Sequence, residues 1–246
     1  MATLQSIQVD VDVPASVRAV SLSHAARHDT DLLLKTFLTS AFSGPVIRPW
    51  MMHRQDGPVA TVFGYSTLST DDLRQRLALA IPALAGAVRG IHGHAMPEFQ
   101  PGVALRFSVR LCPTLHVTPG KEGTARAGHR HGERDAFLVA VDQGAEGPTR
   151  DGVYRAYLAE RLAGARIEAC RLMQMRLAAI LRPHRGSDAP ASGYATRTLP
   201  DVVLEGVLTV IDPVRFTSTL GTGIGRQRGY GRGYVRLEPA RLAVVA

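Results

Sequence analysis

The sequence predicts an α+β protein made of two successive domains with the same order of strands and helices. Stretches in which apolar and polar residues alternate, as in strands, are separated by segments with helix caps and helical spacing. The order of these segments is repeated in the second half of the chain. At 246 residues and 45% hydrophobic content, the chain is long enough for two domains and too apolar to be wholly disordered.

The first hundred residues have the order β-α-β-β-α-β, which is the ferredoxin-like motif. Leu4–Val13 alternates apolar and polar residues, Asp29 or Thr30 can cap a helix, and Ser69 can begin a second one. The predicted elements are strand 4–13, helix 30–42, strands 46–54 and 58–65, helix 69–82 and strand 91–99.

The second half repeats this order with insertions. Asp212 and Pro213 mark the start of a helix, and residues 119–134 read as a basic loop rich in Gly, Arg and His. Residues 167–181 fit either a helix or a strand, whose apolar face would hold Ile167, Ala169, Met173, Met175 and Leu177. The other predicted elements are strand 103–117, short helices 135–141 and 151–162, strand 202–210 and strand 234–237. We therefore predict two tandem ferredoxin-like (RRM-like) domains, 1–99 and 100–246, with a C-terminal glycine-rich loop.

Charge and cysteine content narrow the functional classes. Lys and Arg number 29 against 21 Asp and Glu, a net charge of +8 that attracts polyanions. Only Lys35 and Lys121 are lysines, and arginine suits phosphates, although a coding bias toward arginine is an alternative explanation. Two cysteines are too few for a disulfide scaffold or a cysteine-rich zinc site. The sequence shows neither a signal peptide nor a membrane span, so we expect a cytoplasmic protein.

Residues 221–233 form the most informative segment, Gly-Thr-Gly-Ile-Gly-Arg-Gln-Arg-Gly-Tyr-Gly-Arg-Gly, with six of the 24 glycines. Glycines permit close approach of backbone amides to an anion, arginines add charge, and Tyr230 offers a stacking face. The segment follows a predicted helix and lacks the spacing of a dinucleotide fingerprint or a P-loop. A glycine hairpin with incidental arginines is the alternative. The predicted RNA contacts here are Gly223, Gly225, Arg226, Arg228 and Arg232.

The C-terminal segment resembles a known family. Residues 202–213, Val-Val-Leu-Glu-Gly-Val-Leu-Thr-Val-Ile-Asp-Pro, followed by the Gly-Ile-Gly-Arg loop, are similar to CRISPR-associated repeat-RNA (pre-crRNA) processing endoribonucleases of the RAMP superfamily. Residues 101–107 with Cys112-Pro113-Thr114, and residues 29–42, also fit. The resemblance is closest to the type I-E branch. It implies binding of a CRISPR repeat hairpin, metal-free cleavage at its base, retention of the crRNA, partnership with other effector subunits, and no cofactor.

One feature departs from the type I-E pattern. Members generally carry a catalytic histidine in the first helix, where this chain has Leu34 or Lys35. The divergent type IV branch, which uses a helical insertion against the RNA stem, is therefore a second possibility. Residues 151–181 could supply such an element, although an amphipathic segment with a solvated basic face is the alternative. Its arginines are Arg155, Arg161, Arg166, Arg171 and Arg176.

Metal-free RNA cleavage uses the 2′-hydroxyl of the substrate as nucleophile and needs a base, an acid and cations. Histidine suits proton transfer near neutrality, whereas arginine stays protonated. Lys35 could stabilise charge, and Tyr230 could donate a proton or stack on a base. Surface or packing roles are the alternatives for each residue. The catalytic candidates are His24, His28, Lys35, Arg27 and Tyr230.

The remaining candidates lie in loops and in the first helical region. Arg18 flanks the proposed catalytic segment and could hold a phosphate, as could Lys121, Arg126 and Arg130 in the basic loop. His92-x-His94 and His129-x-His131 have spacing that could share a metal ion, but no acidic or cysteine ligand is near in sequence, so we predict no metal site. Two other functions stay open: an inactive repeat-RNA-binding subunit and a metal-dependent hydrolase.

Overall fold

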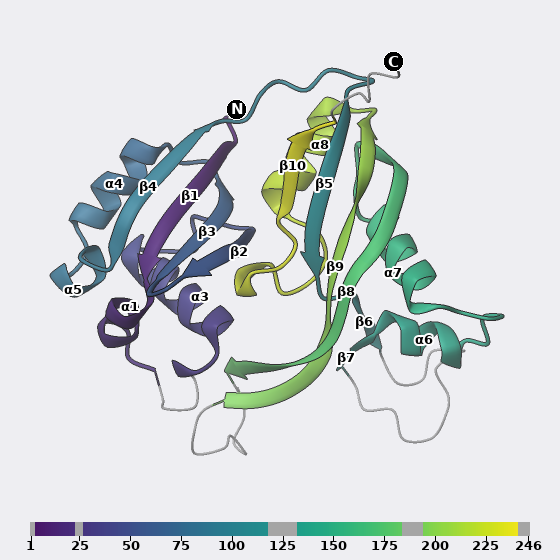
Figure 1. Ribbon diagram of the computed structural model, residues 1–246, viewed down its shortest axis with the longest axis horizontal. Coiled ribbons are helices and arrows are strands. Elements are labelled where there is room, and N and C mark those ends of the chain that lie inside the picture. Colours follow the sequence, from purple (N-terminus) through teal and green to yellow (C-terminus); the bar gives the residue numbers. More distant parts are fainter. Residues whose placement is uncertain (1–2, 23–26, 118–131, 184–193, 241–246) are drawn as a thin grey trace.

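The protein contains two antiparallel four-stranded sheets with helices packed against them (Figure 1). The computed structural model describes residues 3–22, 27–117, 132–183 and 194–240. The sheet orders are β2-β3-β1-β4 and β10-β5-β9-β8. In each sheet the first strand lies between the third and the fourth, as in a ferredoxin-like fold. The predicted fold class is therefore confirmed, while the exact boundary at residues 99 and 100 stays a prediction.

The N-terminal sheet is covered by helices with the predicted caps. Asp29 accepts a hydrogen bond from the Leu32 amide, and Ser69 forms a capping box with Asp72. The predicted strand at residue 46 begins only at Trp50, because Pro49 has no N–H to donate to a sheet. The elements are β1 (Gln5–Asp12), α1 (Val13–Ala19), α3 (Thr30–Ala41), β2 (Trp50–Asp56), β3 (Val59–Ser66), α4 (Thr70–Ala78), α5 (Pro82–Ala85) and β4 (Val88–Ala95).

The C-terminal sheet carries an added hairpin at the end of its first strand. The single strand predicted over 103–117 is divided at Cys112 and Pro113, and its second part pairs with β7. The elements are β5 (Ala104–Leu111), β6 (Thr114–Val117), β7 (Gly132–Asp135), α6 (Ala136–Asp142), α7 (Arg150–Ala159), β8 (Ala165–Pro183), β9 (Tyr194–Val210), α8 (Pro213–Thr222), the 3₁₀ turn η1 (Arg228–Tyr230) and β10 (Val235–Pro239).

The ambiguous segment 167–181 is a strand, because it lies inside β8 and pairs with β9 along its length. The predicted helical element over 151–181 is therefore wrong beyond α7, which occupies the place of the first helix of this domain. The predicted apolar face is only partly right, since Met173 and Leu177 are exposed. Register shifts at Ile167/Ala169 and at Leu172/Gln174 move Ala169 and Met173 off the core face. The second shift restores the original alternation, so the exposure of Leu177 has another cause.

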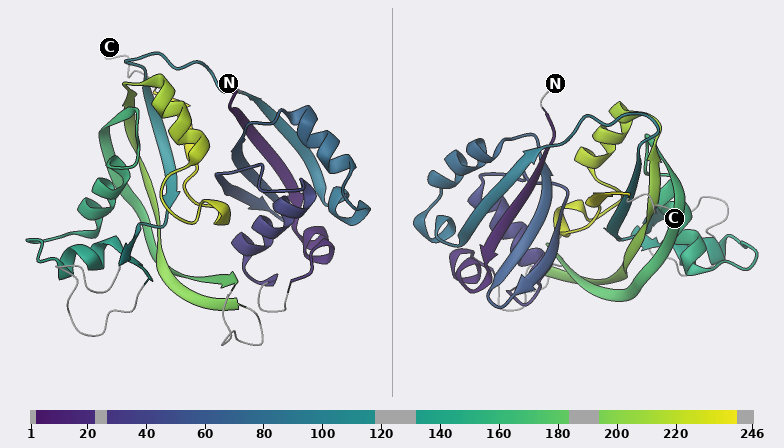
Figure 2. Two further views of the ribbon diagram at one scale, coloured as in Figure 1. Left: turned by 180° about the vertical axis from the view of Figure 1, so that it is seen from behind. Right: turned by 45° about the horizontal axis from the view of Figure 1, so that its top comes forward.

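The two units meet where α8 packs against β3 and where the turn η1 packs against α3 and β2 (Figure 2). The buried Tyr65 hydroxyl donates a hydrogen bond to the Val235 carbonyl oxygen at 2.7 Å. Its ring lies 4.6 Å from that of Tyr234, centroid to centroid. Burial of these two aromatic side chains and the satisfied hydroxyl fix β10 against the N-terminal sheet.

Gly164, which precedes β8, supports a stability prediction. Its φ is +83°, and an added Cβ would lie 2.2 Å from the Phe216 amide nitrogen. Gly102 has nearly the same φ, +86°, with no atom within 4 Å of an added Cβ. We expect Gly164→Ala to lower the free energy of unfolding by about 3 kcal/mol or more, and Gly102→Ala by about 1 kcal/mol. Urea unfolding measures both, and equal losses would contradict this packing.

Candidate functional site

The glycine-rich loop between α8 and β10 is folded against both domains. Its ends are joined by a hydrogen bond from the Ile224 amide to the Gly233 carbonyl oxygen at 2.9 Å. Gly233 has a φ of +77°, and a Cβ there would lie 2.3 Å from the Ile224 carbonyl oxygen, so the turn requires glycine. Gly223 packs on Pro49 of the N-terminal domain, and Gly225 packs on the Tyr157 ring of α7. In this structure, Gly223 and Gly225, which were predicted to contact RNA, allow the loop to pack closely on its neighbours. The arginines of the loop differ in their exposure and are described below.

Lys35 and Tyr230 form a pair across the domain interface. The Lys35 ammonium on α3 donates a hydrogen bond to the Tyr230 hydroxyl at 2.8 Å and lies 4.0 Å from the centroid of the ring. Because the phenol oxygen accepts this bond, its own hydrogen can be donated elsewhere. The structure thus brings together two of the catalytic candidates, which are 195 residues apart in sequence.

A carboxylate connects this pair to the outer arginines of the loop. Arg182, at the end of β8, lies with its guanidinium carbon 5.9 Å from the Tyr230 ring centroid. Arg182 also binds Glu133 at 2.8 Å, and Glu133 accepts a further bond from Arg226. Sequence analysis missed Arg182 and Glu133, because nothing local marks them as neighbours of the loop.

Arginines line a groove beside the loop, with a cavity of about 370 Å³. Arg161 stacks on Tyr157 at 3.8 Å from the ring centroid, and Arg226 and Arg228 contribute from the loop. Burial and the nearby charge of Arg48 lower the pKa of Arg228. Neighbouring cations of this kind suit a polyanion, because an anion relieves their mutual repulsion. Sequence analysis also missed Arg48, whose charge acts on Arg228.

Arg232 has a different position from the other loop arginines. Its side chain is 1% exposed and lies 3.2 Å from an Asp31 oxygen and 3.3 Å from an Asp201 oxygen. Arg110 binds both of these carboxylates, at 3.0 and 2.7 Å. The contact of Arg232 with RNA stays a prediction, and in this structure its buried guanidinium holds two carboxylates. No sequence signal distinguishes it from its neighbours.

Asp201, which binds Arg110 and Arg232, makes the stability of the protein depend on pH. Burial raises its pKa, but hydrogen bonds from Arg110 and the charge of Arg232 outweigh burial and bring the pKa to about 2. A carboxylate with a lowered pKa adds stability above its unfolded pKa of about 4, and this stability is lost as the pH falls toward 2. We expect about 2 kcal/mol of the free energy of unfolding to disappear over that range. The measurement is urea unfolding as a function of pH.

The matched comparison for this prediction uses two asparagine variants. Asp201→Asn should be less stable at pH 7, because it leaves Arg110 and Arg232 with one carboxylate, that of Asp31, in place of two, and it should lose less stability in acid. Asp71→Asn, at an exposed ion pair on α4, should follow the parent protein. If Asp201→Asn lost as much free energy of unfolding in acid as the parent protein, Asp201 would not be the source of the pH dependence.

The structure places the other predicted residues in several separate regions. His28 and Arg176 line a second cavity of about 620 Å³ between α3 and β8, and Arg176 binds Asp201 at 3.0 Å. Arg27 is exposed and donates to the Leu22 carbonyl oxygen, and Arg18 is exposed on α1. Four predictions fall outside the described residues: His24, Lys121, Arg126 and Arg130.

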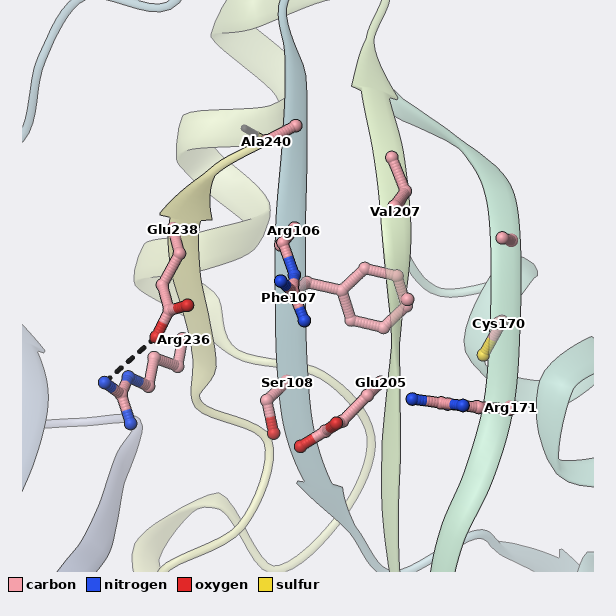
Figure 3. A pocket seen from close by; sticks show the side chains of 12 residues that line it. Arg106, Phe107, Ser108, Cys170, Arg171, Glu205, Val207, Arg236, Glu238 and Ala240 are labelled. Carbon is pink, nitrogen blue, oxygen red and sulfur yellow. Dashed lines mark ion pairs between the residues drawn. The ribbon is translucent and has the colours of Figure 1, made fainter. Parts of the chain in front are cut away.

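Arg171 lies on the open face of the C-terminal sheet, away from the groove of the loop. The side chains around it come from all four strands and surround a cavity of about 610 Å³ (Figure 3). The buried Phe107 and Val109 alternate with Arg106 and Ser108 along β5, which places the arginines opposite the core. Arg155, on α7, is paired with Asp151 at 3.1 Å. Their contact with RNA stays a prediction.

The described part of the chain contains neither a cluster of metal ligands nor a helix that could span a membrane. No group of three or more His, Cys, Asp or Glu side chains in the described part of the chain could hold a metal ion. His92 lies 4.0 Å from Asp10, while His129 and His131 lie outside the described ranges. Among the helices of the described segments, none is both long enough and apolar enough to cross a membrane.

The fold and this cationic face define a two-domain α+β protein with a surface suited to a nucleic-acid backbone. The chain belongs to the CRISPR-associated protein family, because the family model described as "CRISPR associated protein" matches residues 27–239. The family resemblance predicted from the sequence is thereby confirmed. Curated proteins give no match to this chain.

Solved structures share the fold at low sequence identity. A CRISPR endoribonuclease Cse3 bound to a 19-nucleotide RNA has a TM-score of 0.59 and 18% identity, over 96% of this chain and 100% of that chain. Thermus thermophilus Cse3, bound to an RNA representing a pre-cleavage complex, has a TM-score of 0.57 and 20% identity, over 96% of this chain and 100% of that chain. The CRISPR-associated protein Cas6e from Escherichia coli str. K-12 has a TM-score of 0.56 and 16% identity, again over 96% of this chain and 100% of that chain. These structures support the fold of both domains.

Proposed function

We propose that this protein is an endoribonuclease that cleaves CRISPR precursor RNA at the base of the repeat hairpin. The observation that carries the proposal is the continuous arrangement of Lys35, Tyr230, Arg182, Glu133 and Arg226. Lys35 donates a hydrogen bond to Tyr230, and the Arg182 guanidinium lies 5.9 Å from the centroid of the Tyr230 ring. Glu133 then pairs with both Arg182 and Arg226, which reaches the groove of arginines. Family membership and the similarity to RNA-bound Cse3 structures support the same substrate class.

The groove would hold the RNA through its phosphates. Arg161, Arg226 and Arg228 present guanidinium groups that suit phosphate oxygens, and Tyr157 keeps Arg161 flat against its ring. An A-form hairpin displays its phosphates and 2′-hydroxyls at the surface, so shape and charge dominate its recognition. Tight phosphate binding after cleavage would keep the mature crRNA on the protein, where other effector subunits could join it.

Cleavage in this proposal begins with attack of the 2′-hydroxyl oxygen on the adjacent phosphorus. His28, or His24, removes the proton of the 2′-hydroxyl, and Arg27 holds a phosphate oxygen. Lys35 stabilises the negative charge that develops on the phosphorane, and Tyr230 gives its proton to the departing 5′-oxygen. The products are a 2′,3′-cyclic phosphate and a 5′-hydroxyl, and the reaction needs no metal ion.

The test is incubation of the full chain with a labelled repeat RNA in excess EDTA. The proposal expects one cut at the base of the hairpin and a cyclic phosphate that resists phosphatase until it is opened with acid. A repeat RNA with 2′-deoxyribose at the scissile position is the matched control and should stay intact. Cleavage of that control, or cleavage that requires added metal, would overturn the mechanism.

An inactive repeat-RNA-binding subunit is the second candidate function. It is favoured by one observation, namely that α3 presents Lys35 toward the loop and contains no histidine. Lysine carries a proton at neutral pH and serves as a base only after strong perturbation. The same EDTA experiment separates the two functions, because the second one predicts tight binding and no cut under any metal condition.

A further inference from the structure

One face of α3 contacts the glycine-rich loop at two points that are one helical turn apart. Asp31 and Lys35 are four residues apart and therefore lie on the same face. Asp31 binds Arg232, and Lys35 binds Tyr230, two residues earlier in the loop. The Arg232 guanidinium also donates to the Tyr230 carbonyl oxygen at 2.8 Å. The position of Tyr230 is thus tied to Asp31 through Arg232.

The ionic cluster around Arg232 joins the two domains and is largely buried. Asp31 comes from the N-terminal domain, while Arg110, Asp201 and Arg232 come from the C-terminal one. Arg110 binds both carboxylates with its Nη2 atom, and its Nε atom donates to Asp201 at 2.8 Å. Gly231 lies between the two contact points, where a Cβ would be 2.9 Å from the Trp50 ring and 3.2 Å from Asp31. The ion pairs of Arg232 and the close packing of Gly231 therefore hold the loop against the N-terminal domain.

We propose that Asp31, Arg232, Asp201 and Arg110, which we term the interdomain clamp, position Tyr230 against Lys35 for the cleavage reaction. This inference rests on the proposed function and assigns positioning residues to it. A buried ion pair adds little net stability compared with an apolar replacement, whereas loss of one partner leaves an uncompensated charge. Such a cluster is better suited to fixing one geometry, and a displacement of about 1 Å at a reacting group can lower a rate about 100-fold.

The clamp residues are largely buried and bind one another. Arg232 and Asp201 are 1% and 3% exposed, and Asp31 and Arg110 are about 15% exposed. Asp31, Arg110 and Arg232 border the cavity of about 620 Å³ that His28 also lines, so the clamp adjoins the proposed base. The groove arginines Arg161, Arg226 and Arg228 hold other partners. Loss of the clamp is therefore expected to slow the chemical step while RNA binding through the groove persists.

The test compares Asp31→Asn with the parent protein and with Asp71→Asn, an exposed carboxylate on α4. Because the sequence has only two lysines, reductive ¹³C-methylation gives two dimethyl-lysine signals besides the amino terminus. A Lys35→Arg variant identifies the signal of Lys35, which the Tyr230 ring should shift upfield. Single-turnover cleavage and the Kd for a 2′-deoxy repeat hairpin are measured on the same samples.

The proposal expects Asp31→Asn to lose most of the ring-induced shift and to cleave at least 10-fold more slowly, with Kd within threefold of the parent. Asp31→Glu, which restores a carboxylate, should recover part of both, and Asp71→Asn should match the parent. An unchanged shift, an unchanged rate, or equal losses in rate and affinity would overturn the clamp. If Asp31→Asn does not fold, Arg232→Lys replaces it.

These readouts separate two kinds of failure. If the parent protein does not cleave repeat RNA, the proposed function fails, whereas the Lys35 signal still reports whether the clamp positions the pair. If the parent cleaves and the Asp31→Asn variant cleaves equally fast, the clamp alone fails.

Discussion

Replacing Arg226 and Arg228 together with alanine should weaken binding of a repeat hairpin about 10- to 100-fold at physiological salt. Both side chains line the groove beside the loop, and the loss of about 1 kcal/mol for each partly exposed ionic contact gives a change of this size. Each lost phosphate contact also removes close to one counterion from the salt dependence. The slope of log K against log salt should therefore fall in magnitude by about 2. The measurement is a hairpin titration at several salt concentrations.

The control for this variant removes the same charge elsewhere. Arg74 and Arg89 are exposed side chains of the N-terminal domain that pair with Asp71 and Asp12. Arg74→Ala with Arg89→Ala lowers the net charge equally and should leave both affinity and salt slope close to those of the parent. If the two double variants behave alike, only overall charge matters, and the groove has no specific role in binding.

Replacing Lys35 with alanine should lower the single-turnover cleavage rate about 100- to 1000-fold. The ammonium is the charged donor to the Tyr230 hydroxyl, and loss of one preorganised donor in an active site has costs of this size. Tyr230→Phe keeps the ring and removes the proton, so it should lower the rate by about 100-fold or more. Quench-flow or manual time courses at saturating protein measure both variants.

Binding distinguishes a catalytic role of this pair from a binding role. The Kd of each variant for a 2′-deoxy hairpin should stay within about threefold of the parent, because the groove arginines are unchanged. Ser40→Ala, at an exposed position of α3, is the matched control and should cleave at the parent rate. Rates within threefold of the parent in Lys35→Ala would remove Lys35 from the proposed chemistry.

Local signals in the sequence were sufficient for most elements of the fold. Asp29, Ser69 and Asp212 cap their helices as predicted, since each cap depends only on residues within three positions. Segment 167–181 remained ambiguous because two register shifts in β8 interrupt the period of two that identifies a strand. Helix α1 was missed, because its seven residues follow directly on β1 and are too few for a clear helical pattern.

Candidate site residues that lie in one continuous segment could be predicted from the sequence. Contacts between residues that are far apart in the sequence could not. The glycine-rich loop and Tyr230 were predicted from composition alone. The burial of Arg232 was not, because it depends on Asp31 of α3 and Asp201 of β9, which belong to different domains. Arg48 and Glu133 were missed for the same reason. The pairing of Lys35 with Tyr230 likewise becomes visible only when the two domains are placed together.

The most direct measurement is the structure of this protein bound to a repeat hairpin with 2′-deoxyribose at the scissile position. Our account predicts that the scissile phosphate lies within hydrogen-bond reach of Lys35 and Tyr230. It also predicts that the adjoining stem phosphates contact Arg226 and Arg228 in the groove. A hairpin seated on the open sheet face around Arg171, with the loop groove empty, would contradict the account.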